Sequence, residues 1–302
     1  MQRNGALFSV ALGPPVVVAA RSQNLPGLVT DGEGGVLDAV ADPRIVNNDA
    51  ILVSYTATGA TGTKLVVVRG GGDHWTTVFE TPEMPGNVRF GGRLAFTVTT
   101  PAESNRTVLL ISVGDRGRSD LAQDKGSYFG KTVRVNFDQP TPIASNPFVG
   151  VPGAKPEIWT LGHRDPIFAA SSAFASNSIA IDRGAAPGGG DVVQYIQRGC
   201  TYAWPNAVPD SPSPLFVWAT PVRPLTMYFY DGTSTESANG DLLVGAENYS
   251  GVIQLRWGGT SFTETNRFVL PHPLQKIRRF RGSLHGLEVG HSGRLVRLDP
   301  SY

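Results

Sequence analysis

The sequence has little cysteine and no excess of either charge. A single cysteine, Cys200, stands among 302 residues, which excludes an internal disulfide and any metal cluster built on several cysteines. The five histidines show no metal-ligand spacing, so no zinc site is predicted. The 26 basic and 25 acidic residues give a net charge of +1, without a run of five like charges. This balance predicts neither a nucleic-acid partner nor a membrane surface.

The chain also lacks a sustained 3.6-residue apolar period, and its 36 glycines and 23 prolines interrupt it too often for long helices. What it has is a unit of two short apolar runs separated by a polar break, which occurs six times. The units span residues 16–29, 51–68, 108–135, 179–196, 242–257 and 284–298. Apolar runs bounded by glycine, asparagine, aspartate and serine are typical of β-hairpins.

A repeat of about 40–50 residues is how four-stranded propeller blades appear in a sequence. We therefore predict an all-β fold, a six-bladed β-propeller of four-stranded antiparallel blades, in one domain over residues 1–302. The last unit would close against the first. Residues 1–20 have the basic start and apolar stretch of a secretory signal, but Pro14 and Pro15 interrupt them. A cytoplasmic protein is the prediction, with secretion left open.

Six segments carry a family resemblance: GEGGVLDAVADP (32–43), RFGGRLAF (89–96), LISVGDRGRSDLAQD (110–124), PEIWTLGHRDP (156–166), GGDVVQYIQRGCTYAWP (189–205) and KIRRF (276–280). In content and order they resemble the soluble glucose and sorbosone dehydrogenases, quinoproteins that hold pyrroloquinoline quinone (PQQ) and calcium on a six-bladed β-propeller. The resemblance implies hydride abstraction from the anomeric carbon of a sugar, with a histidine as general base and the quinone as acceptor.

The residue at the position of the family's base is not a histidine. The family motif resembles (D/N)-H-x-G-G-R-L, and residues 88–94 read VRFGGRL, which puts Arg89 at the base position. An arginine, with a pKa above about 12, stays protonated and cannot accept a proton. This replacement argues against the family reaction.

Other positions that face the sugar or the quinone in the family have also changed. Glu33 stands in place of a glutamine, and Asp165 in place of an asparagine next to a retained Arg164. Near the C-terminus, the family's R-x-R pair reads Lys276-Ile277-Arg278. The lysine keeps the positive charge but loses one guanidinium that could bind a carboxylate through two hydrogen bonds. Residues 184–192, compared with the segment that shapes the calcium and cofactor site, keep a proline, the glycines and Asp191.

These departures predict a propeller repurposed for redox-neutral chemistry of the lyase, isomerase or cyclase type on a small organic metabolite in the central pocket, without a cofactor. Glu33, Arg89 and Asp165 are the candidate catalytic residues, because carboxylates transfer protons and arginines stabilise developing negative charge. Arg164, Lys276 and Arg278 are the candidate substrate-binding residues.

Three other interpretations stay open. One is an aldose sugar dehydrogenase that still uses PQQ and calcium, for which Asp191 is the metal candidate. Another is a non-catalytic propeller that binds a ligand or a protein. In the third, the charged residues form structural ion pairs that fill the space left by the cofactor.

Overall fold

The structure is a computed structural model that describes residues 2–11, 17–22, 24–43, 50–71, 73–99, 106–138, 142–169, 178–230, 240–280, 282–288 and 294–298. Within these ranges the regular structure is strand, apart from short 3-10 turns such as Ser119–Leu121 and Pro187–Gly189. The chain divides into two compact units, Met1–Leu161 and Gly162–Tyr302. No described helix has the length and apolar character needed to span a membrane. The single domain over residues 1–302 stays a prediction.

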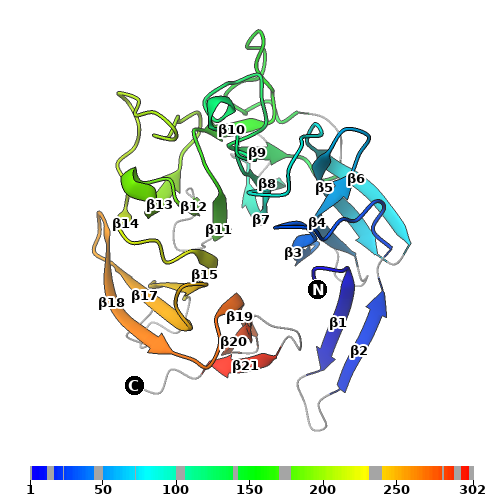
Figure 1. The fold of residues 1–302 in the computed structure, drawn as a ribbon, viewed down its shortest axis with the longest axis vertical. Helices are drawn as coiled ribbons and strands as arrows, with labels where there is room; N and C mark the ends of the chain where they lie inside the picture. Colours follow the sequence, from blue (N-terminus) through cyan, green and yellow to red (C-terminus); the bar gives the residue numbers. More distant parts are fainter. Residues whose placement is uncertain are drawn as a thin grey trace. The chain divides into compact units, whose positions relative to one another are not determined.

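Unit Met1–Leu161 contains two four-stranded antiparallel sheets in which each strand pairs with the next along the chain (Figure 1). The first comprises β3 (Val36–Ala41), β4 (Ile51–Thr58), β5 (Thr63–Gly71) and β6 (His74–Glu80). The second comprises β7 (Gly91–Val98), β8 (Thr107–Val113), β9 (Lys131–Val135) and β10 (Ile158–Leu161). This meander is the architecture of a propeller blade.

Unit Gly162–Tyr302 repeats the pattern. One sheet comprises β11 (Pro166–Ala169), β12 (Ser178–Asp182), β13 (Asp191–Ile196) and β14 (Phe216–Trp218). The next comprises β15 (Pro224–Phe229), β16 (Leu242–Ala246), β17 (Gly251–Trp257) and β18 (Phe262–Val269). The last has three strands, β19 (Leu274–Phe280), β20 (Ser283–Glu288) and β21 (Leu295–Leu298).

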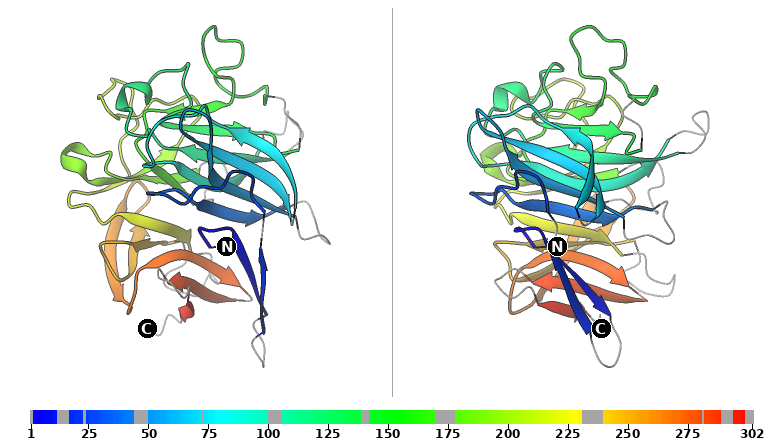
Figure 2. Two further views of the ribbon diagram at one scale, coloured as in Figure 1. Left: turned by 45° about the vertical axis from the view of Figure 1, so that its right-hand side comes forward. Right: turned by 90° about the vertical axis from the view of Figure 1, so that its right-hand side faces the viewer.

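The protein is therefore an all-β propeller with antiparallel blades. The described residues form five blades, four of them four-stranded and the last three-stranded, so the predicted number of six is wrong. The error lies in the unit at 16–29. Its β2 (Val17–Ser22) pairs backward with β1 (Ala6–Ala11) in a two-stranded ribbon, seen in blue in Figure 2. The second half of the predicted unit is a turn, because Pro26 lacks a backbone N–H and Gly27 has φ +68°.

The middle strands are apolar on both faces because each blade packs against its neighbours. All five residues of β9 and all five of β16 are buried, whereas β18, at the edge of its sheet, is mostly exposed. In the first unit Leu52 and Leu65 from one blade share a core with Leu109 and Ile111 from the next. The strands that follow these loops are thereby held by a core that two blades share.

The turn between β10 and β11 depends on Gly162. This residue has φ +83°, and an added Cβ would overlap the backbone carbonyl of Tyr202. Gly162→Ala is therefore expected to lower the free energy of unfolding by about 2–4 kcal/mol, from the strained dihedral plus the clash. In the matched variant Gly188→Ala, the dihedral is similar at φ +79° but nothing lies within 4 Å of the added Cβ. Urea denaturation should show a loss of about 1 kcal/mol for this control; equal losses in the two variants would contradict the role of the clash.

Candidate functional site

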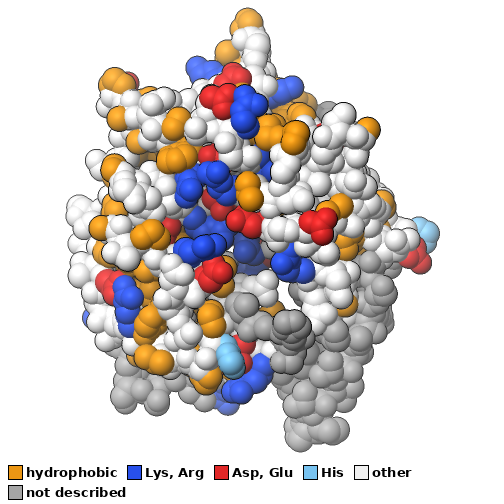
Figure 3. All heavy atoms as spheres, viewed as in Figure 1, with side chains coloured by type: hydrophobic (Ala, Val, Ile, Leu, Met, Phe, Trp, Pro, Cys, Tyr) orange, Lys and Arg blue, Asp and Glu red, His pale blue; other side chains and the backbone are white. Residues whose placement is uncertain are grey.

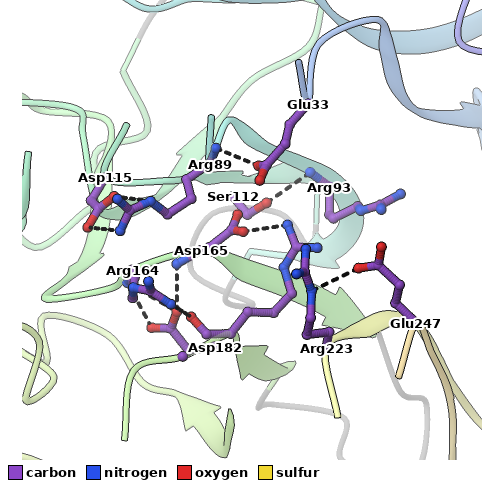
Figure 4. A network of polar contacts seen from close by, with 12 residues as sticks. Glu33, Arg89, Arg93, Ser112, Asp115, Arg164, Asp165, Asp182, Arg223 and Glu247 are labelled. Atoms are coloured by element: carbon purple, nitrogen blue, oxygen red, sulfur yellow. Dashed lines mark hydrogen bonds and ion pairs between the residues drawn. The ribbon is translucent and has the colours of Figure 1, made fainter. Parts of the chain in front are cut away.

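Two predicted catalytic residues meet in the first unit, in the turn before β7. The backbone N–H of Arg89 donates a hydrogen bond to Glu33 Oε2 at 2.6 Å (Figure 4). The Arg89 guanidinium instead pairs with Asp115, with Nε 3.4 Å from Oδ1 and Nη1 3.5 Å from Oδ2. The Asp115 side chain is fully buried, so it supplies a fixed negative charge. Glu33, in contrast, is exposed.

Glycines allow the chain to turn tightly at this point. Arg89 itself has φ +47°, and Gly91 and Gly92 follow with φ +69° and +75°. A Cβ on Gly114 would overlap the carbonyl oxygen of Arg89, so only glycine fits opposite the turn. The G-G-R-L and G-D-R-G segments of the sequence thus build one loop pair that fixes the backbone N–H of Arg89 against Glu33.

A second arginine, Arg116, supports the same turn from inside the protein. It is buried and donates to Thr63 O at 3.2 Å, Thr63 Oγ1 at 2.9 Å, Met84 O at 3.3 Å and Gly86 O. Its guanidinium lies 3.8 Å from the ring centroid of Phe90, the residue after Arg89. Burial lowers the pKa of Arg116 to about 10, which still leaves it protonated at pH 7.

In the second unit Asp182, on β12, organises the turn that carries Arg164 and Asp165. Its Oδ1 accepts the backbone N–H of Asp165 at 2.7 Å and that of Arg164 at 3.0 Å, and its Oδ2 lies 3.1 Å from Nδ1 of the buried His163. The carboxylate of Asp165 forms an ion pair with Arg183. Asp165 is thus a buried, paired carboxylate, whereas Glu33 is an exposed one.

Arg164 has a donor that the described residues leave unused. Its Nη1 donates to the Arg183 carbonyl at 3.2 Å, and its guanidinium lies 5.2 Å from the ring centroid of Trp204. Its Nε is buried and has no hydrogen-bond partner among the described residues. A Cβ on Gly184 would occupy the place of Nη1, so this glycine leaves room for the guanidinium. A buried donor beside an aromatic ring suits the carboxylate of a planar ligand.

The two remaining predicted binding residues, Lys276 and Arg278, lie two positions apart on β19 and therefore on one face of that strand. Lys276 is half-buried and Arg278 is exposed, with Nη1 donating to the Ile277 carbonyl at 2.8 Å. Their roles in binding stay predictions.

Asp191, the calcium candidate of the sequence, accepts three backbone hydrogen bonds in the structure. Its Oδ1 accepts the N–H of Gly184 at 2.8 Å, and its Oδ2 accepts those of Val222 at 2.8 Å and Arg223 at 2.9 Å. These three donors occupy most of the roughly four lone-pair sites of the carboxylate, so a role for Asp191 as a calcium ligand stays a prediction. In the part of the chain that the structure describes, no three His, Cys, Asp or Glu side chains are grouped to hold a metal. Asp191 ties two loops together instead.

The sequence did not reveal the residues that bond to the predicted ones, Asp115, Asp182 and Arg183. It also did not reveal the separate ion pair of Arg223 with Glu247. Arg223 forms an ion pair with Glu247 at 2.8 Å and has φ +53°. One signal could have found it, because a Val-Arg pair at 222–223 precedes β15 just as the pair at 88–89 precedes β7. Charges of both signs are interspersed on the face in Figure 3.

The chain matches known proteins over nearly its whole length. The family model described as Glucose / Sorbosone dehydrogenase matches residues 1–297. Aldose sugar dehydrogenase YliI of Escherichia coli is 28% identical over 94% of this chain and 82% of its own length. The crystal structure of the soluble aldose sugar dehydrogenase of Escherichia coli in the apo form is 26% identical to this chain, with a TM-score of 0.87. The match covers 99% of this chain and 92% of that one. A PQQ-bound aldose sugar dehydrogenase of Streptomyces coelicolor shares the fold at 20% identity, with TM-score 0.71 over 97% of this chain and 92% of that one.

Proposed function

This chain belongs to the glucose/sorbosone dehydrogenase family, and we propose that it oxidises an aldose sugar with PQQ as the hydride acceptor. The observation that carries the proposal is the contact of 2.6 Å between Glu33 Oε2 and the backbone nitrogen of Arg89. Arg89 holds the position of the family's histidine base, and Glu33 places a carboxylate beside it. The proton acceptor is kept, but it comes from a different residue.

Glu33 would take the proton of the anomeric hydroxyl. Asp115 supports this role indirectly, because it pairs with the Arg89 guanidinium while the Glu33 carboxylate accepts the Arg89 backbone N–H. The relatedness to the aldose sugar dehydrogenase of Escherichia coli supports the choice of substrate class.

PQQ, when bound, supplies the acceptor for the hydride of the anomeric carbon. Arg164 fits this anionic, planar group, since its Nε is buried without an acceptor and its guanidinium lies over Trp204. Arg164 would hold a carboxylate of the quinone by charge-assisted hydrogen bonds. Lys276 and Arg278 are further candidates for that role. A calcium role for Asp191 stays a prediction.

Redox-neutral chemistry is the second candidate, favoured by the ion pairs of Arg89 with Asp115 and of Arg183 with Asp165. Paired carboxylates and arginines can transfer protons and stabilise an enolate without an electron acceptor. The substrate would again be a small polar metabolite. The cytoplasmic location and the non-catalytic alternative stay predictions of the sequence.

A PQQ titration combined with a dye-reduction assay on a panel of aldoses distinguishes the two candidates. We expect saturable binding that raises the melting temperature, and dye reduction that requires both PQQ and an aldose. Arg164→Gln should weaken PQQ binding by about tenfold or more, because a charge-assisted hydrogen bond is lost. Arg223→Gln, which removes an exposed arginine of the same unit, is the matched control. Failure to bind PQQ would overturn the dehydrogenase, and aldose conversion without PQQ would favour redox-neutral chemistry.

A further inference from the structure

The loop that carries Glu33 presents three backbone carbonyls to one side chain from the start of the chain. Arg3 Nη2 donates to Thr30 O at 2.8 Å and to Gly32 O at 2.7 Å. Arg3 Nε donates to Gly34 O at 2.8 Å. The three carbonyls belong to alternate residues of the loop that precedes β3. One guanidinium therefore binds this loop on both sides of Glu33.

The backbone of Arg3 is itself fixed beside the same loop. Its carbonyl accepts the N–H of Val36, the first residue of β3, at 2.9 Å. Gly35 has φ +114°, and a Cβ on it would lie 2.9 Å from the Arg3 carbonyl oxygen. A glycine at the end of the GEGG segment thus allows residue 3 to approach closely.

The N–H groups of the loop are bonded to other parts of the unit Met1–Leu161. Glu33 N donates to Asn87 O at 2.8 Å, and Gly35 N donates to Thr56 Oγ1 at 2.8 Å. Asn87 lies two residues before Arg89, whose backbone N–H binds the Glu33 carboxylate. The loop is therefore held from two sides, and Arg3 supplies the donors on the carbonyl side.

We propose that Arg3 is a positioning residue that keeps the Glu33 carboxylate at the Arg89 turn by binding the carbonyls on both sides of it. Its effect on the reaction rests on the proposed function, whereas its binding of the loop requires neither PQQ nor a sugar. The planar fork of a guanidinium holds several acceptors at defined positions, and a small displacement of a general base slows the reaction strongly. Arg3 is exposed, so water can solvate the three carbonyls when its side chain is removed, and the blades stay folded.

The first test follows hydrogen exchange of residues 29–36 by mass spectrometry in the protein without PQQ. In Arg3→Ala we expect this segment to exchange about tenfold faster or more, because the loop opens more often. The matched control is Arg106→Ala, which removes another exposed arginine of the unit, at the opposite end of β8 from Asp115. It should exchange in this segment as the parent does. Unchanged exchange in Arg3→Ala would overturn the proposal, whether or not the protein oxidises a sugar.

The second test measures dye reduction with PQQ and an aldose. Arg3→Ala should lower kcat by about tenfold, with the melting temperature and the Kd for PQQ unchanged. Methylguanidinium should restore part of kcat, because it can bind the carbonyls in place of the exposed side chain. Tetramethylammonium has the charge but no N–H donor, and should restore none.

Faster exchange with an unchanged kcat would overturn the role of Arg3 in the reaction. Equal recovery with the two ions would replace its hydrogen bonds by charge alone, and would overturn the proposed contacts. A parent protein that reduces no dye would overturn the proposed function and the effect of Arg3 on kcat. The exchange experiment would still decide whether Arg3 holds the loop, so the two failures are distinguishable.

Discussion

Glu33→Gln is expected to lower kcat for aldose oxidation by about 10²–10⁴-fold, the range for loss of a general base. The glutamine amide oxygen can still accept the backbone N–H of Arg89, so the substitution removes the proton acceptor and keeps the contact. Glu33 is exposed, so the fold and KM for the sugar should change little. The measurement is steady-state dye reduction at saturating PQQ over a range of aldose concentrations.

Glu83→Gln is the matched control for this prediction. Glu83 is another carboxylate of the same unit that accepts a backbone N–H, from Thr61 at 2.8 Å, and no role in the reaction is assigned to it. Activity of Glu83→Gln should equal that of the parent. If Glu33→Gln also kept full kcat, Glu33 would not be the base and the proposed function would lose the observation that carries it.

A double substitution tests whether the base has moved between positions. Arg89→His combined with Glu33→Gln restores the residue types of the family motif, and histidine tolerates the positive φ of this turn. The buried Asp115 would then face an imidazole, which it can orient and whose charged form it can stabilise. Activity should rise about tenfold or more above Glu33→Gln alone, because a general base returns. No recovery would mean that the turn no longer presents a base at position 89.

The hairpins within each blade could be predicted because their signals are local in sequence. The number of blades was predicted wrongly because it depends on strand pairing that the local pattern does not determine. Apolar runs and glycine-rich turns lie within one hairpin, so the units at 51–68 and 242–257 were found as β4–β5 and β16–β17. The number of blades depends on which strand β2 pairs with, and the apolar pattern of residues 16–29 fits a partner on either side. Only the turn at Pro26 and Gly27 decides between them.

The candidate site also has a part that the sequence predicted and a part that it did not. Glu33, Arg89 and Asp165 were found because they replace motif residues, and the structure does bring Glu33 to Arg89 across 56 positions of sequence. The partners that set their chemistry could not be found by spacing. Asp115 lies in a glycine turn, where an aspartate ordinarily caps its own backbone, and it does accept the Gly117 N–H as well as pairing with Arg89. The same ambiguity made Asp191 a metal candidate, because a carboxylate beside glycines serves a cation or a loop equally well.

Arg116→Met is expected to lower the free energy of unfolding by about 2–4 kcal/mol, because it removes four hydrogen bonds donated by one charged group. Those bonds join Arg116 to Thr63, Met84 and Gly86, which lie 53, 32 and 30 residues earlier in the chain, and the guanidinium also packs on Phe90. Methionine can fill the space over Phe90 but offers no donor. Urea denaturation at pH 7 measures the loss.

The control lies two residues away. Arg118 is exposed and pairs with Asp120 at 2.6 Å, so Arg118→Met should leave the stability almost unchanged. Arg116→Lys should recover only part of the loss, because an ammonium cannot reproduce the planar fork that reaches Thr63, Met84 and Gly86 together. Since Phe90 follows Arg89, Arg116→Met should also loosen the turn that holds Arg89 to Glu33, and kcat should fall along with stability. Equal urea midpoints for Arg116→Met and Arg118→Met would show that the buried arginine does not stabilise this turn. The position of the Arg89 backbone N–H beside Glu33 would then have to depend on Gly91 and Gly114.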